Sequence, residues 1–159
     1  MEKIASFKVD HLRLLPGLYV SRKDNVNGNI ITTFDMRVTR PNIEEVMDTK
    51  SIHAYEHLGA TFLRNDKEYK DKTIYFGPMG CRTGFYVIFN FDCTSRDVLD
   101  IITKMNEFVI NYVGDVPGAT PKDCGNYKDI DLDGAKKFAE KYKRDFLNNP
   151  QDIQLNYPN

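Results

Sequence analysis

The sequence predicts an α+β fold, in which an antiparallel β-sheet carries helices packed on one face. Three observations lead to this prediction. Short segments rich in β-branched and aromatic residues recur early in the chain, longer segments with helical spacing of apolar residues lie between and after them, and the two kinds do not alternate regularly. The 159 residues contain no repeat, low-complexity tract or linker, so we expect a single domain over residues 1–159.

Four segments have the composition of strands. They are residues 17–21, 30–39, 73–76 and 84–91. In the second of them, apolar side chains alternate with Asp35 and Arg37, which predicts a strand with one buried face. The polar cluster of residues 23–28 predicts a turn between the first two strands, and the Gly-Pro-Met-Gly sequence of residues 77–80 predicts a tight corner between the last two.

Three segments place apolar residues at intervals of three and four, which predicts amphipathic helices. They cover about residues 48–64, 94–112 and 132–147. Either Asp48 or Ser51 can cap the first helix, and Thr94 followed by Asp97 resembles a capping box at the start of the second. We expect the apolar stripes of these helices to form the core.

Charge and composition argue against two classes of partner. The chain has 22 basic and 23 acidic residues, interspersed, with a net charge of −1, so we expect no nucleic acid partner. The apolar runs are too short for a membrane span, and the first residues have no apolar core of signal-peptide type. Three cysteines cannot all pair within one chain. We therefore expect a cytoplasmic protein with free thiols.

The sequence His53-Ala-Tyr-Glu-His57 lies within the first predicted helix and is the most informative stretch of the chain. Positions i and i+4 of a helix lie on one face, with Cβ atoms about 5–6 Å apart, so the two imidazoles can share a metal ion. Glu56 projects near the same edge and can exchange protons with a group that the metal binds. The alternative interpretation is a solvated helix face on which three polar residues fall together by chance.

Two histidines leave a metal ion unsatisfied, and Cys124, followed by Gly125 in a turn-like segment, is the candidate for a third ligand. A His₂Cys set leaves the fourth position open for water or substrate, as in catalytic rather than structural sites. These ligand types permit Zn²⁺, Fe²⁺ or Co²⁺. The alternative for Cys124 is a lone reduced thiol.

The other two cysteines occupy different settings. Cys81 lies at the predicted corner beside Arg82, where a nearby cation or metal would lower the pKa of the thiol and allow it to act as a base. The alternative for Cys81 is a small buried hydrophobic residue. Cys93 lies between a predicted strand and a predicted helix, and we interpret it as structural.

Several segments, in order, resemble the S-ribosylhomocysteine lyase (LuxS) family over essentially the whole chain. They are residues 6–11 (SFKVDH), 34–42 (FDMRVTRPN), 52–65 (IHAYEHLGATFLRN), 77–86 (GPMGCRTGFY), and the turn at 124–125 followed by residues 132–135 (LDGA). The resemblance implies a metal-dependent C–S lyase that cleaves S-ribosylhomocysteine to homocysteine and 4,5-dihydroxy-2,3-pentanedione, the precursor of autoinducer-2. It also implies a homodimer with its sites at the subunit interface.

The resemblance assigns roles to individual residues. It implies that His53, His57 and Cys124 hold one divalent metal ion per subunit, Fe²⁺ in this family. It implies that Cys81 and Glu56 are the catalytic groups that move protons. Four further residues match positions that line the substrate pocket of the family: Ser6, His11, Arg37 and Arg64.

Three positions depart from the family pattern. Tyr75 stands where the family usually has a carboxylate and Gly77 where it has serine, which alters the part of the pocket expected to hold the amino group of the substrate. Gly59 stands where the family tends to have leucine, and it weakens the helix by about 1 kcal/mol relative to alanine. Two alternatives follow: a non-catalytic or substrate-altered metal-binding relative, and a small His-x-x-Glu-His metallohydrolase.

Overall fold

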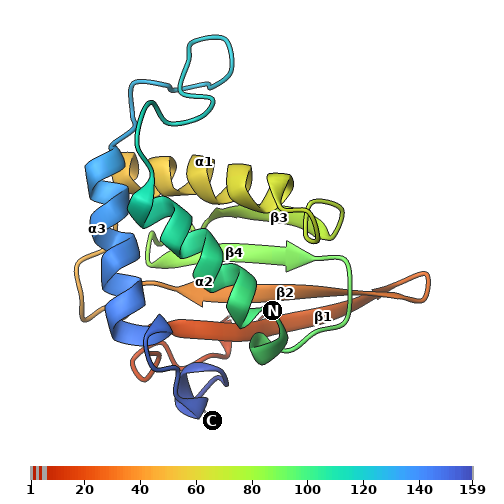
Figure 1. Ribbon diagram of the computed structural model, residues 1–159. Helices are drawn as coiled ribbons and strands as arrows, with labels where there is room; N and C mark the ends of the chain where they lie inside the picture. Colours follow the sequence, from red (N-terminus) through yellow and green to blue (C-terminus); the bar gives the residue numbers. More distant parts are fainter. Residues whose placement is uncertain (1, 3, 5–6, 159) are drawn as a thin grey trace.

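The computed structural model describes residues 2, 4 and 7–158. Within these residues, four strands form one antiparallel sheet in the order β1-β2-β4-β3, and three α-helices cover one face of it (Figure 1). The strands are β1 (Gly17–Val26), β2 (Asn29–Arg37), β3 (Thr73–Pro78) and β4 (Gly84–Phe89). The helices are α1 (Thr49–Asn65), α2 (Ser95–Asn111) and α3 (Leu132–Tyr142). The predicted α+β fold class is confirmed.

Strand β2 lies inside the sheet and shows how the two faces differ. Phe34 and Met36 are fully buried in the core beneath the helices, whereas Asp35 and Arg37 point to the opposite face, as the alternation of side chains in a strand requires. Pairing between β2 and β4 places Arg37 opposite Gly84. This register brings Arg37 to the corner between β3 and β4.

The first hairpin is longer than the sequence suggests. β1 continues through most of the polar cluster at residues 23–28, and Asn27 and Gly28 alone form the turn, with φ of 52° and 87°. Positive φ at both central residues is the geometry for which an Asn-Gly pair is favoured. The prediction of a turn over the whole cluster is wrong because this end of the hairpin extends beyond the core, where a strand can be polar on both faces.

The helices begin and end close to the predicted positions. Asp48 rather than Ser51 caps α1, and its side chain accepts hydrogen bonds from the backbone N–H groups of Lys50 and Ser51. The predicted capping box of α2 is present. After Tyr142, α3 continues as a π-helical turn over Lys143–Leu147. No helix among the described residues is long and apolar enough to cross a membrane.

Buried hydrogen bonds join the three helices. Tyr55 of α1 donates to Asn106 of α2, and the side-chain amide of Asn106 donates to the carbonyl oxygen of Ala139 on α3 at 2.9 Å. All three residues are fully buried, so these bonds satisfy polar groups that have lost their contact with water. The relative placement of the helices is therefore fixed by polar contacts as well as by apolar packing.

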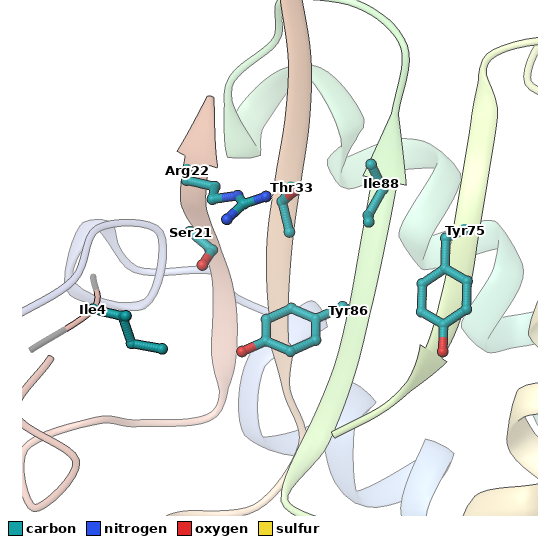
Figure 2. Close-up of a pocket in the computed structure, with 7 residues that line it drawn as sticks. All are labelled: Ile4, Ser21, Arg22, Thr33, Tyr75, Tyr86 and Ile88. Atoms are coloured by element: carbon teal, nitrogen blue, oxygen red, sulfur yellow. The ribbon is translucent and has the colours of Figure 1, made fainter. Parts of the chain in front are cut away.

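The opposite face of the sheet is partly covered by the C-terminal residues. Gln154, in the short helix η3 (Asp152–Gln154), donates to the carbonyl oxygen of Pro16 at 2.8 Å, and the ring of Tyr157 stacks on Tyr19 of β1. Beside this covered part lies a hollow of about 320 Å³, which we call the open-face hollow (Figure 2). It is lined by Ile4, Ser21, Arg22, Thr33, Tyr75, Tyr86 and Ile88.

Candidate metal centre

Helix α1 carries both histidines of the pentad on one side and core residues on the other. Ala54, Tyr55 and Leu58 are fully buried, whereas His53 and His57 are half-buried. The histidines face the loop of residues 113–131, which we call the metal loop. This loop connects α2 to α3 and projects from the helical layer beside the start of α1 (Figure 1).

The two imidazoles and the thiol of Cys124 converge. The Nε2 atoms of His53 and His57 lie 3.1 Å apart, and Sγ of Cys124 lies 3.4 Å from Nε2 of His53. One donor atom from each residue falls within 4.8 Å of the other two. The structure therefore brings together the three residues that the sequence proposes as metal ligands.

Each imidazole is oriented by its other nitrogen. Nδ1 of His53 lies 2.8 Å from the carbonyl oxygen of Asp129, and Nδ1 of His57 lies 2.7 Å from that of Pro117. In a neutral ring, the nitrogen that faces a carbonyl carries the proton, so Nε2 keeps a free lone pair. Outer hydrogen bonds of this kind orient histidines for metal binding.

The spacing of the donor atoms fits one divalent metal ion. A tetrahedral ion at ordinary bond lengths would separate two nitrogens by about 3.3 Å, and a nitrogen from a sulfur by about 3.6 Å. The observed separations are 3.1 Å and 3.4 Å. Two facing lone pairs at such a distance repel each other unless a cation lies between them. Three ligands also leave one position of a tetrahedral ion open, as in catalytic sites.

The metal loop supplies Cys124 together with both carbonyl oxygens. Within the loop, the backbone N–H of Cys124 donates to the carbonyl oxygen of Thr120 at 3.0 Å, which places the thiol at a turn. Val116 is buried in the core and anchors the start of the loop. The sequence predicts Cys124 but not Pro117 or Asp129, because a backbone carbonyl carries no signal in the type of its residue.

Cys81 is exposed at the corner between β3 and β4 and faces Arg37 rather than its neighbour Arg82. Nη1 of Arg37 lies 3.8 Å from Sγ and donates to Oγ1 of Thr83 at 2.5 Å, and this hydroxyl lies 3.1 Å from the sulfur. Partial burial raises the pKa of the Cys81 thiol, but the hydrogen bonds with Thr83 and the charge of Arg37 outweigh it and lower the pKa overall. Because Cys81 is exposed, it is not the small buried hydrophobic residue of the alternative interpretation. Cys93, which is buried, fits that description instead.

Two of the remaining predicted residues lie on α1. Glu56 is half-buried next to His57. Arg64 is exposed in the last turn and donates to the carbonyl oxygen of Ile74 at 2.7 Å. Arg64 follows His57 by seven positions of helix, which corresponds to about 10 Å along the axis. Arg64 therefore contacts β3 near the end of α1, whereas His57, in the middle of the helix, contacts the metal loop.

The other two predicted residues belong to the N-terminal segment. His11 is half-buried, and its Nδ1 lies 2.8 Å from the carbonyl oxygen of Val9. Ser6 lies outside the described residues. The Nδ1 contact of His11 is therefore with a residue of its own segment and not with the metal loop or α1.

Two of the three departures from the family pattern, Gly77 and Gly59, have steric explanations. A Cβ atom at Gly77 would overlap the hydroxyl end of Tyr75, whose side chain lies across this glycine. A Cβ atom at Gly59 would overlap the ring of Phe76, which lies against α1. The side chain of Tyr75 as placed therefore requires Gly77, and the close approach of α1 to β3 requires Gly59.

Helices over one face of an antiparallel sheet, a His₂Cys group spaced for one ion and a separate thiol of lowered pKa together favour the class of mononuclear metalloenzymes. Comparison with known families specifies this class further. Residues 4–153 match the profile of the family described as S-ribosylhomocysteinase (LuxS). The chain belongs to the LuxS family.

Relatives are similar over their full length. The S-ribosylhomocysteine lyase of Clostridium beijerinckii is 55% identical over 159 residues, which is 100% of both chains. That of Finegoldia magna is 54% identical over 158 residues, 99% of each chain. That of Borreliella burgdorferi is 48% identical over 158 residues, 99% of this chain and 100% of its own. These similarities do not favour the metallohydrolase or the non-catalytic alternative.

Proposed function

We propose that this chain is an S-ribosylhomocysteine lyase, a C–S lyase that releases homocysteine and 4,5-dihydroxy-2,3-pentanedione. The observation that carries the proposal is the convergence of His53, His57 and Cys124 on one site, in a chain whose relatives are named for this reaction. The three residues would hold one divalent metal ion. We propose Fe²⁺, with Zn²⁺ or Co²⁺ as ions that the same ligands accept.

The substrate itself dictates what the site must do. Its thioether lies several bonds from the aldehyde carbon, so the sulfur can leave only after the carbonyl has moved along the sugar until the carbon that bears the sulfur is β to it. Moving the carbonyl along the sugar requires protons to leave one carbon and reach its neighbour. A divalent metal bound at the His₂Cys site would supply a Lewis acid for the sugar oxygens. The protein must supply the groups that carry the protons.

Cys81 and Glu56 are proposed for this work. The lowered pKa of the Cys81 thiol favours the thiolate, which can take a proton from one carbon and return it to the next. Glu56 would move protons at the sugar oxygens and remove the last C–H proton. The electron pair of that bond then expels the sulfur, and homocysteine leaves.

Four residues are proposed to bind the substrate: Ser6, His11, Arg37 and Arg64. Since Arg64 lies about 10 Å from His57 along α1, a substrate that reaches from Arg64 to a metal ion held by His57 must be extended. Arg37 also donates hydrogen bonds to Asp35 and Thr83, and these bonds hold its charge beside the Cys81 thiol. We therefore propose that Arg37 has a second role, which is to favour the thiolate of Cys81. Tyr75 and Gly77 would alter the part of the pocket expected to hold the amino group of the substrate, and neither residue is a proposed metal ligand.

We further propose a homodimer with its sites at the interface, located in the cytoplasm, where the three free cysteines stay reduced. The second copy would cover the open-face hollow (Figure 2). Tyr86 and Ile88 line this hollow, together with Tyr75, of which 44% is exposed. Aromatic and aliphatic side chains of this kind are typical of the centre of a subunit interface.

The central test is the release of homocysteine from S-ribosylhomocysteine by anaerobically purified, Fe²⁺-loaded protein. Cys81→Ala should abolish release and leave the metal content unchanged, because Cys81 is not among the clustered ligands. Cys93→Ala, at a buried cysteine, is the matched control and should retain turnover. Turnover by Cys81→Ala would contradict the role of Cys81. No turnover by the fully metallated native protein would contradict the lyase function.

A further inference from the structure

A buried ion pair lies behind Cys81 on the face of the sheet away from the helices. Asp35 and Arg37 are 2% and 3% exposed. Nε of Arg37 donates to Oδ1 of Asp35 at 3.0 Å, and Nη2 donates to Oδ2 at 2.5 Å. This bidentate contact occupies one edge of the guanidinium and leaves Nη1 to face Thr83 and Cys81. The orientation of Arg37 toward the sulfur therefore depends on the carboxylate of Asp35.

Asp35 in turn has a partner in the C-terminal segment. The hydroxyl of Tyr157 donates to Oδ2 of Asp35 at 2.9 Å, across 122 positions of sequence. Burial and the negative charge of Asp35 raise the pKa of Tyr157, so the hydroxyl retains the proton that it donates. The ring stacks on Tyr19, with centroids 4.9 Å apart and planes 11° apart. Tyr157 is thus held by its ring and contacts Asp35 through its hydroxyl.

We propose that Tyr157 is a positioning residue for Cys81. By fixing the carboxylate of Asp35, the Tyr157 hydroxyl holds the guanidinium of Arg37 against the sulfur and keeps the thiol in its reactive form. The consequence for turnover rests on the proposed catalytic role of Cys81, whereas the consequence for the thiol does not.

Several other groups face this set of contacts from β1, β2 and β4. They are Tyr19, Ser21, Arg22, Thr33 and Tyr86. Tyr19 lies opposite Asp35, but its hydroxyl donates to the carbonyl oxygen of Leu15 at 2.9 Å. Burial and the charge of Asp35 raise the pKa of Tyr86, so this residue stays neutral near pH 7. Tyrosines whose pKa is raised stay neutral near pH 7, and arginines stay charged. A change in the alkylation rate with pH in this range therefore reflects ionisation of the Cys81 thiol.

Tyr157→Phe removes the hydroxyl and keeps the stacked ring. In the metal-loaded full chain, iodoacetamide alkylation of Cys81 should be followed against pH on the Cys81 peptide by mass spectrometry. We expect the midpoint of this pH profile to be higher in Tyr157→Phe than in the native protein by about half a pH unit. Alkylation of the variant should therefore be about threefold slower at a pH below both midpoints. The kcat/KM for S-ribosylhomocysteine should fall by the same factor there and recover at a pH above both midpoints.

Tyr19→Phe is the matched control, because it removes a hydroxyl from the same stacked pair without removing a bond to Asp35. Its midpoint should equal that of the native protein. A chain that ends at Asn156 lacks both ring and hydroxyl and should raise the midpoint at least as far as Tyr157→Phe. An unchanged midpoint in Tyr157→Phe, or an equal rise in Tyr19→Phe, would overturn the proposal. If the native protein lacks lyase activity, the alkylation profile still decides the role of Tyr157.

Discussion

The group of His53, His57 and Cys124, which we call the metal cluster, has each of its histidines fixed through Nδ1, the nitrogen that faces away from the other donor atoms. The acceptors are the backbone carbonyl groups of Pro117 and Asp129. A carbonyl oxygen is present whatever the side chain, so substitution at either position keeps the acceptor as long as the backbone keeps its path. The pentad and Cys124 could therefore be predicted from residue types, whereas the groups that orient the histidines could not.

Asp48 offers a test at the scale of one residue. The hydrogen bond from the Ser51 side chain, with those from backbone N–H groups, lowers the pKa of Asp48 in the folded chain. Its contribution is therefore present above the pKa of the unfolded chain and is lost as the pH falls through the lower, folded pKa. We expect Asp48→Ala to lower the free energy of unfolding by about 1 kcal/mol at pH 7.

Urea unfolding at several pH values measures this effect. The difference between Asp48→Ala and the native protein should shrink below about pH 4. Asp48→Asn keeps a capping oxygen but lacks the charge, so at pH 7 its stability should lie between those of Asp48→Ala and the native protein, and its difference from the native protein should also shrink below about pH 4. A difference that is the same at pH 7 and at the lowest pH would show that the carboxylate charge does not stabilise α1.

The helices and strands could be predicted where a local signal marks them. Thr94 and Asp97 form the expected capping box, and Asn27-Gly28 forms the kind of turn for which this pair is favoured. The pairing of β2 with β4 has no local signal, because α1 and β3 separate these strands along the chain. The contact between Arg37 and Cys81 depends on that pairing. The sequence therefore pointed to Arg82, the neighbour along the chain, as the nearest cation.

The close packing of α1 on β3 leads to a prediction at Gly59. Helix propensity alone would make Gly59→Ala stabilising by about 1 kcal/mol. A Cβ atom there would overlap the ring of Phe76, however, and overpacking of a core costs about 1–3 kcal/mol. We expect a net loss of about 1 kcal/mol in the free energy of unfolding, measured by urea denaturation.

The double variant Gly59→Ala with Phe76→Leu separates the two effects. Leucine leaves space for the new methyl group, so the double variant should be more stable than Phe76→Leu alone. If Gly59→Ala instead lowers the free energy of unfolding by the same amount in the native protein and in Phe76→Leu, the Phe76 ring is not the reason that glycine is required.

Over the whole molecule, the two chemical clusters occupy different parts of the fold. The metal cluster joins α1 to the metal loop, and a second group, Arg37, Cys81 and Thr83, which we call the thiol cluster, joins β2 to the corner before β4. The first lies on the helical layer, whereas the second continues to the opposite face of the sheet through Asp35 and Tyr157. That opposite face is covered in part by the C-terminal residues and otherwise carries the open-face hollow.

The proposed homodimer is tested at this scale. Ile88→Glu places a charge within the open-face hollow, so burial of this face against a second copy would become unfavourable. We expect the native chain to have the mass of a dimer by light scattering and Ile88→Glu that of a monomer. Val113→Glu is the control, because Val113 is 88% exposed in the metal loop. A native monomer, or a dimer that persists in Ile88→Glu, would place the interface elsewhere or remove it.

The metal loop also differs from the β1–β2 hairpin in its tolerance of a change in length. Residues 117, 124 and 129 each contact a histidine of α1, so one inserted residue between them would displace the proposed ligand Cys124 or a carbonyl group that orients a histidine. The tip of the hairpin is exposed and lies beyond the core. A peptide tag can therefore be inserted at Asn27-Gly28, whereas the number of residues from 117 to 129 must be kept.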